Sequence, residues 1–299
     1  MHPPLEDLAC IVVHHRSPQT LLATVDALIH SGVVAERILV VDNSAEATLA
    51  TELRPRGIGL LQTRNRGYAA AINDGLAALD RSSGIREYTL VATHESLAEH
   101  TAVSELLAAM RSDDAIAVAG PTLVVAGQTD RTWSTGGYLS PWLKLPRHHL
   151  ADDASGRVRD RDWLDGAFTL YRTAELRAHT LDELYFLYFE ETDLHTRMRA
   201  AGKRVVWVPA ATVSQTSSGI PPRLLGRNLF LFHSKLFSRR RGRCAVLYEA
   251  ARSQARVLLA RRGRWSDARQ IVAGWWDAER LVTGRAPRHP YPSESAARG

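Results

Sequence analysis

Two adjacent carboxylates, Glu190 and Glu191, are the residues best placed to do chemistry in this sequence. Four aromatic residues precede them: Tyr185, Phe186, Tyr188 and Phe189. A basic segment that ends at Gly202 follows, so the pattern predicts a short helix whose dipole keeps both acids ionised at neutral pH. An ionised carboxylate beside a substrate hydroxyl can act as a general base. For Asp193 we expect a structural pair with Arg197 at i,i+4 spacing instead.

The elements that must position these acids follow from the hydrophobic pattern. Strands are predicted at residues 8–14, 37–42, 58–63, 88–92 and 116–119, with helices at 20–30, 68–79 and 97–110. Alternating strands and helices with short connections are typical of right-handed βαβ units, so we expect an α/β fold with a mostly parallel sheet flanked by helices. In such sheets, ligands bind beyond the carboxyl ends of the strands.

The remaining segments differ in composition. Residues 147–162 are polar and are predicted to form a mobile loop, and strands are predicted at 163–172 and 204–208. A helical pattern follows at 224–237, 245–259 and 265–281, which predicts a helical C-terminal extension at 220–285. The tail at 286–299 is rich in Pro, Ser and Ala and is predicted to be disordered.

The overall composition is that of a globular protein. Of the 299 residues, 45% are hydrophobic and 23% are charged. Cys10 and Cys244 are the two cysteines, and the apolar surroundings of Cys10 favour a reducing compartment without a disulfide. We expect a soluble, cytoplasmic protein, because the N-terminal segment does not resemble a signal peptide and no apolar run reaches about 18 residues.

Positive charge is concentrated in the C-terminal part of the chain. The net charge is +6, but residues 220–299 carry 17 Lys or Arg against 5 Asp or Glu. Such a region suggests an anionic partner, and the cluster Arg239, Arg240, Arg241 and Arg243 predicts peripheral contact with an anionic membrane at its inner face. A solvated arginine-rich surface is the alternative. No recognised nucleic-acid-binding motif accompanies the charge, so we expect no nucleic-acid partner.

Several strings, taken in order over about residues 8–230, resemble the family-two nucleotide-sugar glycosyltransferases and their bacterial rhamnosyltransferase-like branch. They are VVDNS at 40–44, NRGYAAAINDG at 65–75, WLDGAFTLYR at 163–172, LYFEETDLHTRMRAAG at 187–202 and the pair Arg227-Asn228. The resemblance implies a GT-A-type fold. It also implies a catalytic domain over 1–219, with a nucleotide-sugar half at about 1–125 and an acceptor half at about 126–219.

The resemblance implies a nucleoside-diphosphate sugar donor, of dTDP-rhamnose or UDP-sugar type. Its expected contacts are His15, Asp42, Asn43, Asn65, Gly67, Asn73, Thr93 and Glu95. Asp42 can accept the imide N–H of uracil or thymine, although a turn or helix cap is the alternative for this string. Asn65 and Gly67 are expected to leave room for the ribose and phosphates, with Arg64 or Arg66 as a cation. A loop before a helix is the alternative there.

On the acceptor side, the resemblance implies Asp165 and Gly166 as lining residues and Glu191 as the base, assisted by Glu190. Trp133, Tyr138 and Trp142 are expected to form a platform for a sugar or lipid, with core packing as the alternative. The acceptor is expected to be a glycan, a lipid-linked molecule or a small molecule. A homodimer is a further expectation.

Metal binding is the point where the sequence departs from the family. The usual acidic motif after the fourth strand is replaced by Thr93-His94-Glu95, and a later His by Gln215. Glu95, with His94 as a possible nitrogen ligand, can still hold Mg²⁺ or Mn²⁺. A metal-free mechanism, in which arginines neutralise the diphosphate, is the alternative.

We therefore predict an inverting glycosyltransferase. One alternative is a non-catalytic relative that binds nucleotide sugars. Another is a nucleotidyltransferase, although His14-His15-Arg16-Ser17 stands where such an enzyme would carry a glycine-rich phosphate loop.

Overall fold

A computed structural model describes residues 5–82, 84–150, 155–216, 219–260 and 263–284. The predicted tail at 286–299 lies outside the described residues. Within these ranges, no helix is both long and apolar enough to cross a membrane.

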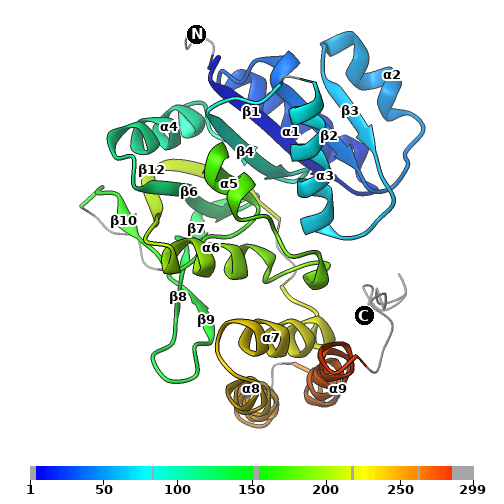
Figure 1. Cartoon of the computed structure of the whole chain (residues 1–299), viewed down its shortest axis with the longest axis vertical. Helices are drawn as coiled ribbons and strands as arrows, with labels where there is room; N and C mark the ends of the chain where they lie inside the picture. The colour runs from blue at the N-terminus through cyan, green and yellow to red at the C-terminus, as the bar shows by residue number, and fades with distance from the viewer. Residues whose placement is uncertain (1–4, 83, 151–154, 217–218, 261–262, 285–299) are drawn as a thin grey trace.

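One large sheet forms the centre of the molecule (Figure 1). Its main path runs in the order β10 (Arg159–Asp160), β12 (Arg204–Gln215), β6 (Ile116–Val125), β11 (Phe168–Arg172), β4 (Tyr88–Thr93), β1 (Leu8–His14), β2 (Ile38–Asp42) and β3 (Gly59–Gln62). All of these strands share one direction except β10 and β11, which run antiparallel to their neighbours. The predicted mostly parallel α/β sheet is confirmed.

Shorter strands extend this sheet and form a separate hairpin. The two side strands are β5 (Leu97–Ala98), which pairs with β12, and β7 (Gln128–Ser134), which pairs with β6. A second sheet consists of β8 (Gly137–Leu139) and β9 (Pro146–His148). In Figure 1 this hairpin extends from the main sheet towards the C-terminal helices.

Helices cover both faces of the main sheet because each face presents apolar side chains. One core contains residues of α1 (Pro18–His30), α2 (Leu49–Leu53) and α4 (Ala102–Ser112). The other contains residues of α3 (Tyr68–Arg81), α5 (Thr173–Ala178) and α6 (Glu190–Ala200). Three short 3₁₀ helices are η1 (Ala35–Arg37), η2 (Arg54–Arg56) and η3 (Glu183–Tyr185).

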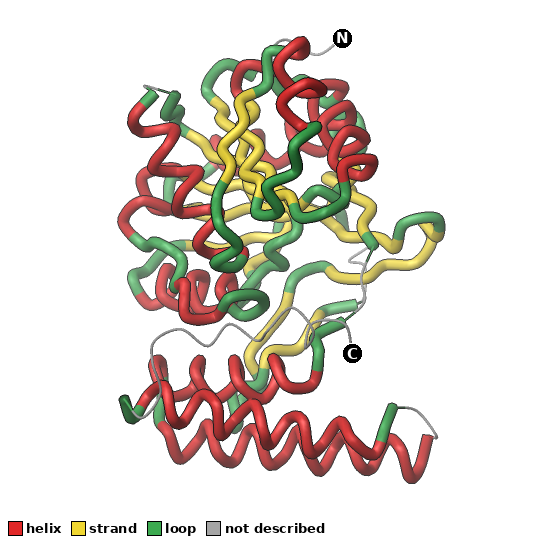
Figure 2. Tube along the Cα trace, turned by 90° about the vertical axis from the view of Figure 1, so that its right-hand side faces the viewer, coloured by secondary structure: helices red, strands yellow, loops and turns green. Residues whose placement is uncertain are grey.

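The C-terminal helices form a layer of their own beside this body (Figure 2). They are α7 (Pro222–Leu236), α8 (Arg239–Ala260) and α9 (Trp265–Val282). Gly226 and Gly274 allow α7 and α9 to approach closely, since a Cβ at either position would lie 1.9 Å from a backbone oxygen of the other helix. The apolar core of this layer also includes Tyr185, Phe189 and Leu145, so it packs against the segment before α6 and against the hairpin.

The structure corrects several predicted boundaries, including the strand predicted at 116–119, which continues to Val125, and the helix predicted at 245–259, which begins at Arg239. Residues 97–98 form strand β5 rather than helix, because they pair with Ser214 and Val213 of β12. The predicted strand at 163–172 begins only at Phe168, and the predicted loop at 147–162 contains β10 and part of β9. The last strand does not stop at Pro209. It continues to Gln215 through a register shift between Val208 and Thr212, where proline is tolerated because the ladder is interrupted.

Candidate active site

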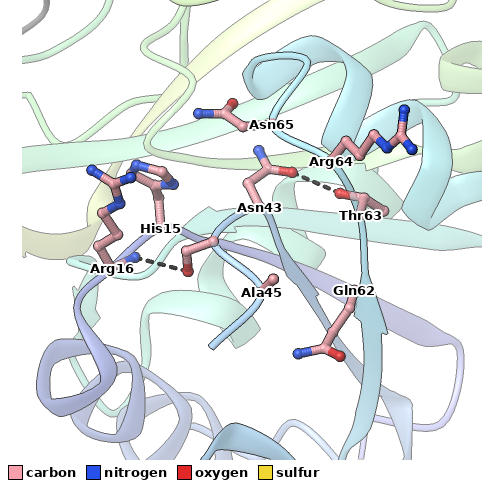
Figure 3. Close-up of a pocket in the computed structure, with 9 residues that line it drawn as sticks. His15, Arg16, Asn43, Ala45, Gln62, Thr63, Arg64 and Asn65 are labelled. Carbon is pink, nitrogen blue, oxygen red and sulfur yellow. Dashed lines mark hydrogen bonds between the residues drawn. The ribbon is translucent and has the colours of Figure 1, made fainter. Parts of the chain in front are cut away.

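A cavity of about 470 Å³ lies beyond the carboxyl ends of β1, β2 and β3 (Figure 3). It is lined by His15, Arg16, Asn43, Ser44, Ala45, Gln62, Thr63, Arg64 and Asn65. The structure thus brings together three of the predicted donor-binding residues, His15, Asn43 and Asn65. We call this the strand-end cavity.

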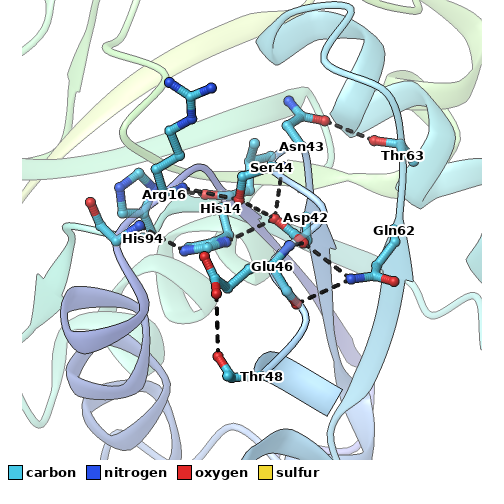
Figure 4. Close-up of polar contacts among 12 residues, drawn as sticks. His14, Arg16, Asp42, Asn43, Ser44, Glu46, Thr48, Gln62, Thr63 and His94 are labelled. Carbon is cyan, nitrogen blue, oxygen red and sulfur yellow. Dashed lines mark hydrogen bonds and ion pairs between the residues drawn. The ribbon is translucent and has the colours of Figure 1, made fainter.

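Asp42 does not line the strand-end cavity. Figure 4 shows its contacts at the end of β2. Its carboxylate is 0% exposed and accepts hydrogen bonds from the backbone N–H groups of Ser44 and Glu46 and from the Ser44 hydroxyl. It also accepts from His14 at 3.0 Å. The Nε2 atom of His14 accepts from the backbone of Ser17, so Nδ1 carries the proton that is donated to Asp42.

These bonds change the expected role of Asp42. Burial alone would raise its pKa, but the hydrogen bonds from Ser44, His14 and Glu46 outweigh burial and lower it. The acceptor capacity of the carboxylate is directed inwards, so the prediction of a direct contact with the nucleobase does not match its surroundings. Asp42 instead fixes the turn that carries Asn43 and Ser44, as the alternative reading of this string proposes.

Gly67 and Asn73 also lie outside the strand-end cavity. A Cβ at Gly67, where φ is +101°, would lie 2.2 Å from the carbonyl oxygen of Phe186, so glycine makes room for protein backbone rather than for phosphates. Asn73 donates to the Leu181 carbonyl and to Glu183. Arg66 pairs with Glu183 and Asp74, which leaves Arg64 as the arginine of this string that lines the cavity.

A second cavity, of about 670 Å³, contains the acid pair, and we call it the acid cleft. The predicted residues that line it are Thr93, His94, Glu95, Trp133, Asp165, Gly166, Glu190, Glu191 and Gln215. The predicted catalytic and metal residues and the acceptor residues Asp165, Gly166 and Trp133 therefore share one cavity, together with Thr93 and Glu95, which were expected near the donor. Side chains without a sequence signal also line it, among them Tyr68, Arg147, His148, Trp163, Arg252 and Arg256.

The acid pair begins α6, as predicted, but its surroundings are apolar rather than dominated by the helix dipole. Glu190 is 2% exposed, and burial raises its pKa to about 7. Burial also raises the pKa of Glu191 well above its ordinary value, and the negative charges of Glu190 and Asp165 add to this. These raised pKa values oppose the prediction that both acids are ionised at neutral pH, because adjacent carboxylates shielded from water repel each other's charge.

The segment before α6 has a strained backbone that is held by α7. Phe186, Tyr188 and Phe189 have φ values of 65°, 70° and 75°, a region that side chains other than glycine rarely adopt. The Asn228 amide donates to the carbonyl oxygens of residues 185, 187 and 188 at 3.2, 2.8 and 2.9 Å. Arg227 donates to the carbonyl oxygens of residues 184 and 185. The pair Arg227-Asn228 thus holds the strained turn that presents the acids.

Other buried contacts fix the loop that faces the acids. Asp165 accepts from Ser134, and its Oδ1 lies 3.6 Å from Nδ1 of His148, although burial raises the pKa of Asp165 overall. Gly166 accepts a 2.6 Å hydrogen bond from the Tyr68 hydroxyl. The backbone N–H of Leu164 donates to the buried ring of His195 on α6. The loop and the acid pair are therefore positioned by the same helix.

The candidate metal ligands His94 and Glu95 directly follow the carboxyl end of β4. Nδ1 of His94 donates to the carbonyl of Val13, and burial lowers the pKa of His94, so its Nε2 lone pair is free to accept and lies 3.6 Å from Glu95. Glu95 also accepts from the Thr216 hydroxyl. The neighbouring Gln215 has a buried Oε1 atom without a hydrogen-bond partner among the described residues. No cluster of three His, Cys, Asp or Glu occurs in the described part of the chain.

The predicted aromatic platform is only partly assembled. Trp133 lines the acid cleft, whereas Tyr138 and Trp142 do not. Trp142 is 88% exposed, and the exposed Tyr138 ring lies tilted against His149, with 4.9 Å between the ring centroids. Trp163 takes their place, with its ring 4.8 Å from that of His148.

Comparisons with known proteins agree with this architecture. The glycosyl transferase family 2 model matches residues 9–168, which is more than half of the chain. GalNAc-T7, in a crystal structure with UDP, GalNAc and Mn²⁺, has a TM-score of 0.60 at 14% identity and is matched over 96% of this chain. This chain spans 59% of the length of that protein.

Two further solved structures have similar scores. The mannosyltransferase PcManGT from Pyrobaculum calidifontis, in complex with GDP-Man and Mn²⁺, has a TM-score of 0.57 at 12% identity, over 93% of this chain and 88% of its own. TarS 1–349 from S. aureus has a TM-score of 0.56 at 14% identity, over 93% and 82%. No curated protein matches the sequence. Identities this low show the GT-A-type fold alone, but with the family match they establish that the chain belongs to glycosyl transferase family 2.

Proposed function

We propose that this protein transfers a sugar from a nucleoside-diphosphate sugar to an acceptor hydroxyl, with inversion at the anomeric carbon. The observation that carries the proposal is the acid pair at the start of α6, which lines the acid cleft of a family 2 fold. Glu191 is the proposed base. It adjoins Gly166, where an added Cβ would lie 3.6 Å from the Glu191 Cβ atom, whereas Glu190 is almost fully buried.

The proposed chemistry is a single displacement. The acceptor oxygen attacks the anomeric carbon, the bond from that carbon to the diphosphate oxygen breaks, and the hydroxyl proton passes to Glu191. A buried carboxylate with a raised pKa is a stronger proton acceptor than one in water, provided that it is deprotonated when the acceptor binds. The raised pKa values favour a pair that holds one negative charge. The pKa of Glu191 is the more strongly raised, so the proposal requires that the shared proton moves to Glu190 when the acceptor binds.

The strand-end cavity is the proposed site of the nucleoside diphosphate, of dTDP-rhamnose or UDP-sugar type. His15, Asn43 and Asn65 offer polar groups for the base and ribose, and Arg16 and Arg64 offer positive charge for the phosphates. Negative charge develops on the departing diphosphate in the transition state, so fixed cations at this place accelerate the reaction.

The residues around Glu95 fit a weakly held divalent cation. His94 Nε2, the Glu95 carboxylate and the unpartnered Gln215 Oε1 supply one nitrogen and two types of oxygen ligand. Mg²⁺ and Mn²⁺ accept such ligands and take the remainder from water and phosphate. When bound, the ion supplies neutralising charge for the diphosphate. Asp165, Gly166 and Trp133, which line the same cleft, are the proposed contacts of the acceptor.

A thermal-shift screen of UDP-, GDP- and dTDP-sugars, with and without Mn²⁺, tests the proposal. A ligand that binds only the folded state raises the melting temperature, so one nucleotide class should stand out. Hydrolysis of that donor in the absence of acceptor separates an enzyme from a binding protein. Binding without hydrolysis or transfer would favour a non-catalytic relative, and no response to any nucleotide sugar would contradict the proposal.

The activity measurement, repeated with a chelator, tests the role of the metal. We expect excess EDTA to reduce activity and Glu95→Ala to weaken the response to Mn²⁺. Full activity of both the chelated wild type and the Glu95→Ala variant would show that arginines neutralise the diphosphate without a metal.

A further inference from the structure

One wall of the acid cleft is basic, and two of its three arginines belong to α8, outside the matched family region. Arg147 on β9 and both Arg252 and Arg256 on α8 line the same cavity as Glu190 and Glu191. Arg252 and Arg256 are four residues apart on one helix, so they lie on the same face one turn from each other.

A buried carboxylate holds two of these arginines in place. Glu249 is 1% exposed, and it accepts hydrogen bonds from Arg147 and from the Nε and Nη2 atoms of Arg252, the latter two at 2.9 and 2.7 Å. Among the described residues, no hydrogen bond involves the other terminal nitrogen of Arg252 or the guanidinium of Arg256. Two cations share one carboxylate and a third has none, so the wall carries an excess of about two positive charges at neutral pH.

The nucleotide does not account for this wall. The strand-end cavity, where we place the nucleoside diphosphate, is lined by different residues and contains its own cations, Arg16 and Arg64. The basic wall instead shares its cavity with the apolar side chains of Ile220, Leu225 and Leu229 and with the acids.

We propose that Arg147, Arg252 and Arg256 bind a phosphate or diphosphate group of the acceptor, an inference that rests on the proposed sugar transfer. An excess of two positive charges suits a dianionic group, and guanidinium forks match phosphate oxygens. The acids at the other part of the cleft repel the same group. The acceptor is thereby oriented with its anion against α8 and its hydroxyl towards Glu191.

Phosphorylated acceptors can be lipid-linked or soluble, and the two classes differ in whether they cover the apolar side chains that line the cleft. A polyprenyl diphosphate would place its first isoprene units against Ile220, Leu225 and Leu229, whereas a soluble phosphate would leave these side chains uncovered. Inorganic pyrophosphate, geranyl diphosphate and geraniol therefore serve as probes for the anion, for the anion with an apolar chain, and for the apolar chain alone.

Titration calorimetry with the full-length protein tests the proposal. We expect geranyl diphosphate to bind and the double variant Arg252→Gln/Arg256→Gln to bind it about tenfold or more weakly, the usual size of lost charged hydrogen bonds. The single variant Arg256→Gln, which breaks no hydrogen bond or ion pair within the described residues, should show part of this loss in a fully stable protein. The control Arg240→Gln/Arg269→Gln removes the same charge from exposed positions that do not line the cleft, and it should bind like the wild type.

The outcomes separate the alternatives. Tighter binding of geranyl diphosphate than of pyrophosphate supports a lipid-linked acceptor, and equal binding supports a soluble phosphorylated one. Equal affinity of geranyl diphosphate for wild type and both cleft variants overturns the proposal, as does equal binding of geraniol. An equal loss of UDP or GDP affinity would assign the wall to the donor. Donor hydrolysis is measured separately on the wild type, so its absence would reject sugar transfer while the anion measurement stands by itself.

Discussion

The strand-end cavity and the acid cleft differ in how their polar groups are satisfied. Around the first, Asp42 accepts several internal hydrogen bonds, Asn43 bonds to Thr63, and Asn65 accepts from the backbone of Gly67. In the second, Glu190 Oε2 and Gln215 Oε1 are buried without a hydrogen-bond partner among the described residues. The first site is therefore preformed, whereas the second is arranged to be completed by ligands.

The backbone shows the same difference. Three residues of the segment before the acid pair, Phe186, Tyr188 and Phe189, have positive φ values. Such backbone strain persists only where the surrounding structure enforces it. The raised pKa values of the acids lower the free energy of unfolding at neutral pH, and they also make the deprotonated acids stronger proton acceptors. Variants in the two sites should therefore have different signatures: lost affinity in one and lost turnover in the other.

Replacement of the proposed base should give the largest effect. We expect Glu191→Gln to lower turnover by at least about 100-fold, a typical size for loss of general-base catalysis, because glutamine cannot accept the proton. Donor affinity should remain, since the strand-end cavity is lined by other residues. Steady-state kinetics with calorimetry on the same preparation measures both. Near-normal turnover in this variant would reject Glu191 as the base, and Glu190→Gln should be milder.

The raised pKa of Glu190 predicts a pH-dependent cost in stability. An acid with a raised folded pKa stabilises the fold fully below its ordinary pKa of 4.5, and this stabilisation is lost as the pH rises through about 7. Relative to wild type, Glu190→Gln should therefore gain about 2 kcal/mol in unfolding free energy between pH 5 and pH 8. Urea denaturation at both pH values measures the change. The exposed Glu52→Gln is the control, and a gain of the same size in that variant would contradict the assignment.

The turnover of the wild type should rise with pH over the range in which its stability falls. The base must be deprotonated to accept a proton, so turnover should rise with pH through about 7 if the pair titrates as its burial indicates. This rising limb belongs to the same pair, and it should change in Glu190→Gln.

In the preformed site, removal of the central carboxylate should weaken nucleotide binding indirectly. Asp42→Ala leaves the donors of Ser44, Glu46 and His14 without their acceptor, so the turn that carries Asn43 should loosen. We expect nucleoside diphosphate affinity to fall by about 1–3 kcal/mol, the usual cost of unpaired buried groups. Asp42→Asn keeps one acceptor oxygen and should lose less. Unchanged calorimetric affinity of folded Asp42→Ala would place the nucleotide elsewhere.

These differences also explain what the sequence could predict. Continuous apolar runs predicted the central strands, which are buried on both faces, and helical periodicity predicted most helices, which bury one face. The acid pair was predictable because aromatic and acidic residues lie next to each other in the chain. The acceptor residues near Asp165 required the resemblance to known enzymes, because nothing local in residues 163–167 indicates that they face α6.

Other features depend on contacts between distant segments. The space at Gly67 is filled by Phe186, more than one hundred residues later, so the same glycine is equally compatible with a phosphate loop. The inward orientation of Asp42 depends on His14 and Gln62 in neighbouring strands. The basic wall joins β9 to α8 through Glu249, and no motif in the sequence connects these segments.

Loss of the Asn228 hydrogen bonds to the strained turn should have a smaller effect, and it should affect the acid cleft but not the strand-end cavity. Asn228→Ala removes three hydrogen bonds to the carbonyl oxygens before the acid pair, so the acids should sample more positions. We expect turnover to fall by about tenfold with donor affinity unchanged, because misplacement of a catalytic group raises the barrier without affecting the other cavity. Ser234→Ala, on the same helix, removes a buried hydroxyl that has no partner among the described residues, and it should behave like the wild type. Equal effects of the two variants would show a general loss of α7 packing.

The smallest expected effect concerns the arginine cluster at the start of α8, which lies apart from both cavities. Three of its members have contacts within the protein: Arg239 donates to the carbonyl of Val282, Arg241 lies over the ring of Phe237, and Arg243 pairs with Glu279. These three arginines therefore have partners inside the protein, and Arg240 is the exposed member of the cluster without such a contact among the described residues.

We still propose peripheral binding to anionic membranes, because the basic charge of this region remains at the surface. Each arginine near the headgroups contributes about 1 kcal/mol, and salt screens this attraction. Arg240→Gln should thus weaken binding to anionic liposomes by roughly fivefold at low salt without a change in melting temperature. Arg243→Gln should lower the melting temperature as well, since it breaks the pair with Glu279 that joins α8 to α9. If the wild type does not sediment with anionic liposomes even at low salt, the membrane proposal is wrong.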